Sequence, residues 1–239
     1  MEGKPLENHA EWKAKLALFC YFGVIGGIFL GSIIVELVLL GLQIDYLDLP
    51  FPLALISLPV NELIILGVTL VFARHKRASW KELGLKRTSL RILTIVTVAT
   101  VPLYLMGVGI SIGQEVVLGP DPTAELVAKL VIPRDALQLV AMIVLSLVLV
   151  GPVEEVAFRG FVQKGFENSL GKTKGLLIAS ALFGIGHSLV SPYSVIPTTF
   201  GGLILGYVWQ KTGENTTASA LMHGIYDSIA IALAYFLTI

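Results

Sequence analysis

The chain has 239 residues, of which 55% are hydrophobic and only 14% are charged, and its mean hydropathy is +0.81. A soluble domain needs more charged and polar residues to cover its surface, so this composition predicts an integral membrane protein. Seventeen Lys and Arg residues balance seventeen Asp and Glu residues, and this neutral sum gives no sign of a nucleic-acid partner.

Four long apolar segments come first along the chain, and each has the roughly 20 residues that cross about 30 Å of hydrocarbon. They are predicted at 16–44, 51–73, 90–113 and 136–163. Three shorter segments carry Gly, His and Asp, which is typical of helices in the interior of a bundle. These are predicted at 174–190, 194–211 and 217–238. Between the two groups, Asp121-Pro122 predicts the start of a short interfacial or re-entrant helix.

These segments predict an all-α fold, a polytopic transmembrane bundle of seven to eight helices. The chain contains no internal repeat and no linker rich in Pro or Ser. We therefore expect residues 1–239 to form a single integral membrane domain, with the chemistry in the half from about 136–239. Gly23, Gly27 and Gly31, spaced by four, predict a close contact between two helices.

The orientation follows from the charges of the short connections, because Lys and Arg gather on the cytoplasmic side. The second connection is basic: Arg74, Lys76, Arg77, Lys81, Lys86, Arg87 and Arg91. The first connection carries Asp45 and Asp48 and no base. Counting through the helices places two more basic groups inside: Lys4, Lys13 and Lys15, and Lys164, Lys172 and Lys174. The acidic loop with Glu115, Asp121 and Asp135 is then predicted outside.

Three charged residues interrupt the fourth long segment, namely Glu154, Glu155 and Arg159. Each costs about 3 kcal/mol at the bilayer centre on insertion scales, so a compensating interaction is expected. Glu155 and Arg159 are four residues apart on one helix face, in the favourable order for an ion pair. Glu154 points about 100° away. We expect it to face a polar cavity, where it can serve as a general base.

Three further ionisable residues lie in the last apolar segments. His187 is flanked by glycines that allow another helix to approach, and His223 and Asp227 are four apart on one face. At about 1.5 Å of rise per residue, these side chains and Glu154 reach a similar middle depth, toward the cytoplasmic side. Pro152 is expected to kink the helix just before Glu154 and to open a water path to the cytoplasm.

The order of these motifs resembles a known family. Glu-Glu-x-x-x-Arg occurs at Glu154 to Arg159, Phe-x-x-x-His at Phe183 and His187, and His-x-x-x-Asp at His223 and Asp227. The chain is similar to the CPBP family of intramembrane proteases, which contains type II CAAX prenyl endopeptidases and bacteriocin-processing or immunity proteins. Leu83-Gly84-Leu85 in the basic loop is a further similarity.

The resemblance implies an eight-helix bundle with a conical polar cavity open to the cytoplasm and the membrane. It also implies that Glu154 activates a water held with His187, while His223, with Asp227, stabilises the oxyanion. Glu155 and Arg159 would support the site, with Phe183 beside them. Many prenyl endopeptidases have Asn where this chain has Asp227, and an ionised carboxylate cannot donate to an oxyanion. We therefore expect Asp227 to act indirectly, by holding His223 as a donor.

The leading hypothesis is thus an intramembrane endopeptidase of the glutamate type, without a cofactor. It is expected to cut near the C-terminus of a lipidated or membrane-anchored protein, and prenylated CAAX proteins are one such class. The enzyme is expected to be in contact with membrane lipid. A zinc protease with His187, His223 and either Glu154 or Asp227 as ligands is one alternative, although no His-Glu-x-x-His helix is present. The other is a non-proteolytic immunity or adaptor protein that binds a peptide or partner in the same cavity. A prokaryotic cell membrane is the expected location.

Overall fold

The structure of the chain, a computed structural model, describes residues 11–44 and 50–238, so Lys4, Asp45 and Asp48 lie outside the described residues. All regular secondary structure in these ranges is helical. The helices outside the central run are α1 (Ala14–Gly41), α2 (Pro50–His75), α3 (Leu90–Leu118), α4 (Ala124–Val131), α8 (Lys172–His187), α9 (Val195–Lys211) and α10 (Thr216–Thr238), with a 3-10 turn, η4 (Pro192–Ser194). The central run is α5 (Ala136–Leu145), η2 (Ser146–Val150), α6 (Gly151–Glu155), η3 (Val156–Gln163) and α7 (Lys164–Leu170).

Five helices of the described chain are long and apolar enough to cross a membrane: Ala14–Gly41, Leu55–His75, Leu90–Leu118, Ala136–Leu170 and Thr216–Leu237. This confirms the predicted all-helical membrane fold. The helices α8 and α9 have 16 and 17 residues, so each reaches only about 25 Å, less than the roughly 30 Å of a hydrocarbon core. The predicted count of seven to eight transmembrane helices is therefore not confirmed: five described helices are long enough to span, and α8 and α9 are shorter.

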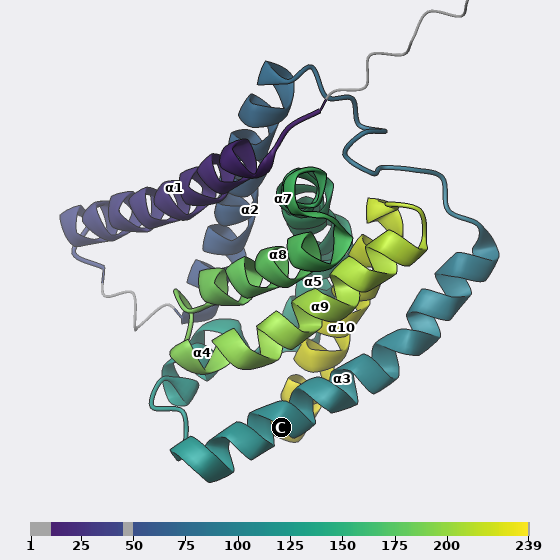
Figure 1. Ribbon diagram of the computed structural model, residues 1–239. Helices are drawn as coiled ribbons and strands as arrows, with labels where there is room; N and C mark the ends of the chain where they lie inside the picture. Colours follow the sequence, from purple (N-terminus) through teal and green to yellow (C-terminus); the bar gives the residue numbers. More distant parts are fainter. Residues whose placement is uncertain (1–10, 45–49, 239) are drawn as a thin grey trace, which may run out of the picture.

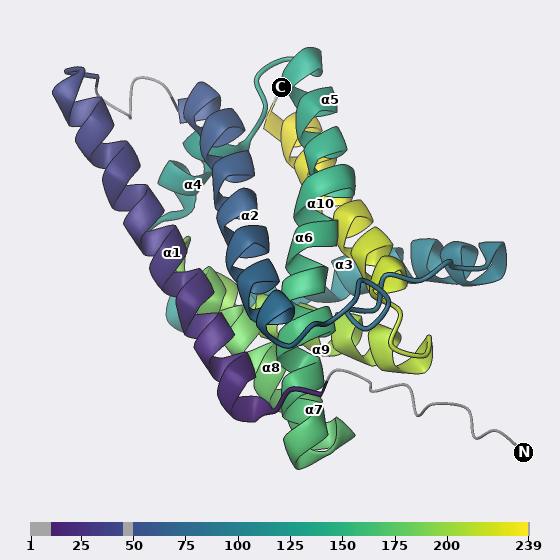
Figure 2. The same ribbon diagram turned by 90° about the horizontal axis from the view of Figure 1, so that it is seen from above.

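The central run is the axis of the molecule. Figure 2 shows α5, α6 and α7 following one another along one long helical rod, with α1 and α2 on one side and α10 and α3 on the other. The pair α8 and α9 lies side by side, and α3 packs against α9 and α10 (Figure 1). A Cβ atom on Gly27 or Gly31 would lie 2.8 Å from the Ile64 side chain, so these glycines allow the close contact of α1 with α2 that their spacing predicts.

One end of the bundle is held together by hydrogen bonds between segments far apart in the sequence. The Trp12 indole N–H donates to the Phe161 carbonyl (2.7 Å), and Lys164 Nζ donates to the Glu82 carbonyl (2.8 Å). The Thr216 hydroxyl donates to the Leu83 carbonyl at 2.7 Å. The three described basic groups of the sequence therefore gather at one end, as predicted. Its assignment to the cytoplasm stays a prediction.

The central helix is irregular around the residues of interest. η2 is a π-helical turn, in which an N–H donates to the carbonyl five residues earlier, as the Gly151 N–H does to the Ser146 carbonyl. Pro152 follows directly, and proline has no N–H to continue an α-helical ladder. The wider turn η3 begins at Val156, so the single turn that carries Glu154 and Glu155 has π-helix on both sides. Such π-turns are frequent at functional sites.

Candidate active site

Glu155 is the buried centre of the candidate site, with a side chain that is 0% exposed. Its Oε2 atom lies 3.2 Å from Arg159 Nε, which is the ion pair that the spacing predicts. Its Oε1 atom lies 3.2 Å from His223 Nδ1 on α10. Arg159, 2% exposed, also donates through Nη2 to the Gly202 carbonyl of α9 at 3.3 Å. Glu155 and Arg159 thus connect the central helix to α9 and α10.

The buried ring of Phe183 on α8 contacts residues of two other elements, η3 and α10, and one residue of its own helix. The Arg159 guanidinium lies 4.4 Å from its centroid, a distance at which a cation is attracted to an aromatic face. The rings of Phe158, His187 and His223 meet it edge to face, with centroid distances of 4.8, 4.7 and 5.9 Å. Phe183 therefore fixes the spacing between the ion pair and the two histidines.

His187 ends α8 and is half-buried. Its Nδ1 atom lies 2.9 Å from the Phe183 carbonyl oxygen one turn earlier. A carbonyl oxygen only accepts, so Nδ1 carries the proton in this bond. In the neutral ring, Nε2 then holds the lone pair, and His187 can accept a hydrogen bond from water at that atom.

His223 lies between two carboxylates. Nδ1 has the hydrogen bond with Glu155, while Nε2 lies 3.6 Å from Asp227 Oδ2, an ion-pair distance too long for a hydrogen bond. We expected Asp227 to hold His223. In the structure the ring is oriented by the hydrogen bond that its Nδ1 donates to Glu155, a residue that the helix spacing paired only with Arg159.

Glu154 belongs to the same charged cluster. Its electrostatic interactions reach Arg159, His223 and Asp227, and Asp227 also interacts with His187. The Oε2 atom of Glu154 is inaccessible to solvent and has no hydrogen-bond partner among the described residues. The four residues predicted to be catalytic thus lie in one cluster, built from α6, α8 and α10.

Comparison with known proteins matches this part of the chain to one family model. The model is described as "Type II CAAX prenyl endopeptidase Rce1-like", and it covers residues 136–229. Residues 136–229 belong to this Rce1-like family. All of the site residues predicted from the motifs lie within the Rce1-like region, and the family resemblance is confirmed there. No curated protein and no solved structure matches the chain.

The Rce1-like region belongs to a family of proteases, and the five apolar helices make the chain an integral membrane protein. Among the described residues, no three His, Cys, Asp or Glu side chains are placed to hold one metal ion. The set proposed for zinc, His187, His223 and Asp227, is therefore not grouped as metal ligands in this structure. The absence of a cofactor stays a prediction.

Glu62 was missed by the sequence analysis. It lies on α2, outside the Rce1-like region, and its side chain is only 4% exposed. It interacts electrostatically with Glu154, His223 and Asp227 of the Rce1-like site. The available signal was a single carboxyl group within an apolar segment, where ionisable residues are rare and usually functional.

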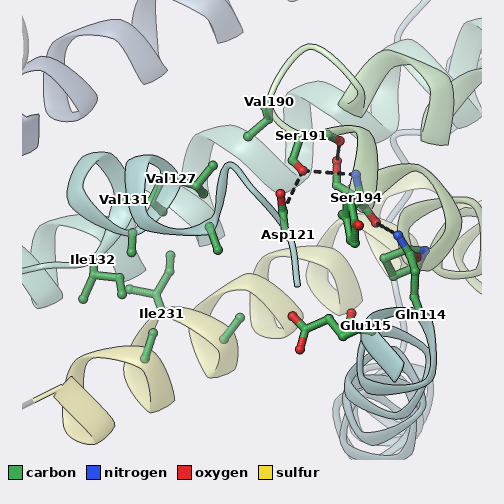
Figure 3. Close-up of a pocket in the computed structure, with 17 residues that line it drawn as sticks. Gln114, Glu115, Asp121, Val127, Val131, Ile132, Val190, Ser191, Ser194 and Ile231 are labelled. Carbon is green, nitrogen blue, oxygen red and sulfur yellow. Dashed lines mark hydrogen bonds between the residues drawn. The ribbon is translucent and has the colours of Figure 1, made fainter. Parts of the chain in front are cut away.

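Two cavities lie at the opposite end of the bundle from the basic residues. The larger, about 900 Å³, is lined by residues of α1, α2 and α4 and includes Asn61 and Leu189. The smaller, about 480 Å³, is lined by α3, α4 and α10 and by the loop after α8. Figure 3 shows Asp121 among its lining residues, where the Ser191 hydroxyl donates to Oδ2 at 2.8 Å. None of the predicted catalytic residues lines either cavity. A polar cavity open to the cytoplasm therefore stays a prediction.

Proposed function

We propose that this protein is an intramembrane endopeptidase in which Glu154 activates a water molecule. The observation that carries the proposal is the cluster of Glu154, His187, His223 and Asp227, in which His223 is held by a Glu155 carboxylate that is itself paired with Arg159. A packing role alone does not call for so many ionisable groups in one apolar bundle. The match of this region to a protease family adds independent support.

In the proposed reaction, Glu154 accepts a proton from a water that also donates to Nε2 of His187. The resulting hydroxide attacks the scissile carbonyl carbon, and the carbonyl oxygen becomes an oxyanion. The His223 Nε2–H donates to this oxyanion. Glu154 then passes its proton to the leaving amine as the C–N bond breaks, which restores the carboxylate.

This role of His223 requires protons on both ring nitrogens, because Nδ1 already donates to Glu155. The carboxylates of Glu155 and Asp227 on either side balance the charge of such an imidazolium. Asp227 thereby contributes charge rather than a hydrogen bond to the oxyanion. The residue that commonly stands here in prenyl endopeptidases, Asn, is not required for this arrangement.

We further propose that the substrate is a lipidated or membrane-anchored protein, cut near its C-terminus at the cytoplasmic side of a prokaryotic cell membrane. Prenylated CAAX proteins are the first class to test. A lipid tail that stays in the bilayer beside the site gives a physical reason for a protease built inside the membrane. The whole chain, residues 1–239, is proposed to act as one domain without a metal or other cofactor.

The test compares the purified wild type with Glu154→Gln on a fluorogenic farnesylated peptide and on a proteome-derived peptide library. Loss of a general base is expected to lower kcat by about 10²- to 10⁴-fold. Glu125→Gln, which changes an exposed glutamate of α4, is the matched control and is expected to retain wild-type rates. Equal cleavage by wild type and Glu154→Gln would refute the proposed function.

The zinc alternative is tested with the same peptides. We expect phenanthroline to leave the rate unchanged and metal analysis of the purified protein to find no stoichiometric zinc. A cellular phenotype that survives in Glu154→Gln would instead favour the immunity or adaptor function.

A further inference from the structure

The buried face of α2 points toward the Glu154 turn. Glu62, Ile65 and Thr69 repeat at helical spacing, and all three are buried. Ile65 packs in one apolar cluster with Val153 and Ala157, the residues that flank the Glu154–Glu155 turn. Because Glu62 lies one turn before Ile65 on this face, its carboxyl group is brought to the side of the central helix that carries the site.

Two carboxyl oxygens are left without partners here. Oε2 of Glu62 and Oε2 of Glu154 are both inaccessible, and neither has a hydrogen-bond partner among the described residues. Glu154 and Glu62 also repel each other electrostatically. A buried polar atom without a partner carries a large desolvation penalty, and two carboxylates that interact electrostatically add mutual repulsion.

The neighbouring basic side chains have their ion pairs and hydrogen bonds with other groups, although Arg159 and His223 also interact electrostatically with Glu154. Arg159 and His223 share Glu155, and His187 donates its Nδ1 proton to the Phe183 carbonyl. Within the described chain, no basic side chain forms an ion pair with Glu62. A single proton held between Glu62 and Glu154 satisfies both orphaned oxygens and leaves the pair with one negative charge, as in other carboxyl pairs that share a proton.

We propose that Glu62 is a positioning residue that holds a proton toward Glu154 and donates it in a hydrogen bond to the Glu154 carboxylate. This inference rests on the proposed function of Glu154 as the base. The bond fixes the Glu154 side chain and keeps its second oxygen, Oε1, for the attacking water. Glu62 itself touches neither the water nor the substrate. The first half of the chain thereby supplies a residue to a site whose other members all lie in residues 136–229.

The kinetic test uses Glu62→Gln and Glu62→Leu. The glutamine keeps an N–H donor for Glu154, so kcat is expected to fall only about threefold, whereas leucine removes the donor and is expected to lower kcat about 10- to 100-fold. KM is expected to stay within about twofold in both variants, because Glu62 makes no contact with the substrate. Thr69→Val removes a buried hydroxyl from the same face of α2 and is expected to keep wild-type kcat.

A second measurement does not depend on proteolysis. In a thermal double-mutant cycle, Glu62→Leu and Glu154→Leu are each expected to lower Tm, because each leaves a buried carboxyl without its partner. The double variant is expected to be no less stable than the weaker single variant, because both polar groups are then gone.

Strictly additive losses of Tm would overturn the proposed pair, as would a folded Glu62→Gln that is as inactive as Glu62→Leu or a Glu62→Leu with wild-type kcat. These results differ from failure of the proposed function, which would appear as an active Glu154→Gln. In that event the thermal cycle still decides whether Glu62 and Glu154 share a proton. The isosteric glutamine keeps the kinetic test decisive if the leucine variant does not fold.

Discussion

Replacing Arg159 by methionine tests how the candidate site is held together. The side chain is 2% exposed, lies 3.2 Å from Glu155 and stacks on Phe183 at 4.4 Å. Methionine keeps much of the apolar volume but leaves the buried Glu155 carboxylate without its arginine partner. Removing one member of a buried ion pair costs about 3–5 kcal/mol, and the cation–π contact is part of this loss. For a chain of this length the change corresponds to a fall in Tm of about 6–20 °C.

The chain carries its own reporter for this experiment. Cys20 is the single cysteine of the sequence, and it is 0% exposed on α1. A thiol-reactive dye therefore labels the detergent-solubilised protein only as it unfolds, and the labelling midpoint gives Tm for each variant. Cleavage of the farnesylated peptide, measured below Tm, reports whether the site survives in the folded fraction.

Two comparisons make the result interpretable. Lys129→Met breaks an exposed pair with Glu125 at 2.8 Å and is expected to leave Tm within about 2 °C. Glu155→Gln combined with Arg159→Met neutralises both partners and is expected to be more stable than Arg159→Met alone. If Arg159→Met unfolded at the wild-type temperature, the ion pair would not be a structural support of the site.

The remaining predictions concern helix packing and one loop. A Cβ atom on Gly151 would lie 2.7 Å from the Ala220 carbonyl of α10, so Gly151→Ala is expected to destabilise the fold by about 1–3 kcal/mol and to lower kcat by displacing His223. Gly109→Ala, whose Cβ would meet no atom within 4 Å, is the control for both measurements. Burial raises the pKa of Asp121, but hydrogen bonds from Thr123 and Ser191 outweigh it and hold the pKa below its ordinary value of 3.8. The stabilisation is therefore present above pH 3.8 and is lost as the pH falls through the lowered pKa. Hydrogen exchange of the α8–α9 loop is expected to rise in that acid range. Compared with wild type, Asp121→Asn is expected to raise this exchange at neutral pH only. An equal rise over wild type at neutral and acid pH would contradict this linkage.

Features set by local chemistry were predictable from the sequence. The apolar runs gave the long helices, because crossing hydrocarbon requires about 20 apolar residues in succession. The Glu155–Arg159 pair also followed directly, since residues four apart share a helix face. Both are decided within one helix, whatever packs against it.

Contacts between helices were beyond this reasoning. The bond between Glu155 and His223 joins residues 68 positions apart, and the spacing on either helix does not say which carboxylate the imidazole meets. Glu62 was overlooked for the same reason. Its presence in an apolar run was visible, but its relation to Glu154 depends on how α2 sits against the central helix, which is set by the packing of Ile65.

Helix ends were also misjudged where hydropathy continues past them. The segment predicted at 174–190 ends as a helix at His187, although apolar residues follow it. The Ser191 side chain accepts from the Tyr193 N–H and starts a 3-10 turn at Pro192, so the chain reverses before the apolar run is exhausted. Apolarity reports what surrounds a segment, whereas turn chemistry decides where the helix stops.

The hydrogen bond from Thr216 to the Leu83 carbonyl has a consequence for biosynthesis. It joins positions 133 residues apart, and α10 begins at Thr216 and carries His223. A nascent chain inserted only as far as α9 therefore has neither this hydrogen bond nor the His223 imidazole that contacts Glu155. The proposed site is therefore complete only after α10 has been synthesised and has packed against the central helix.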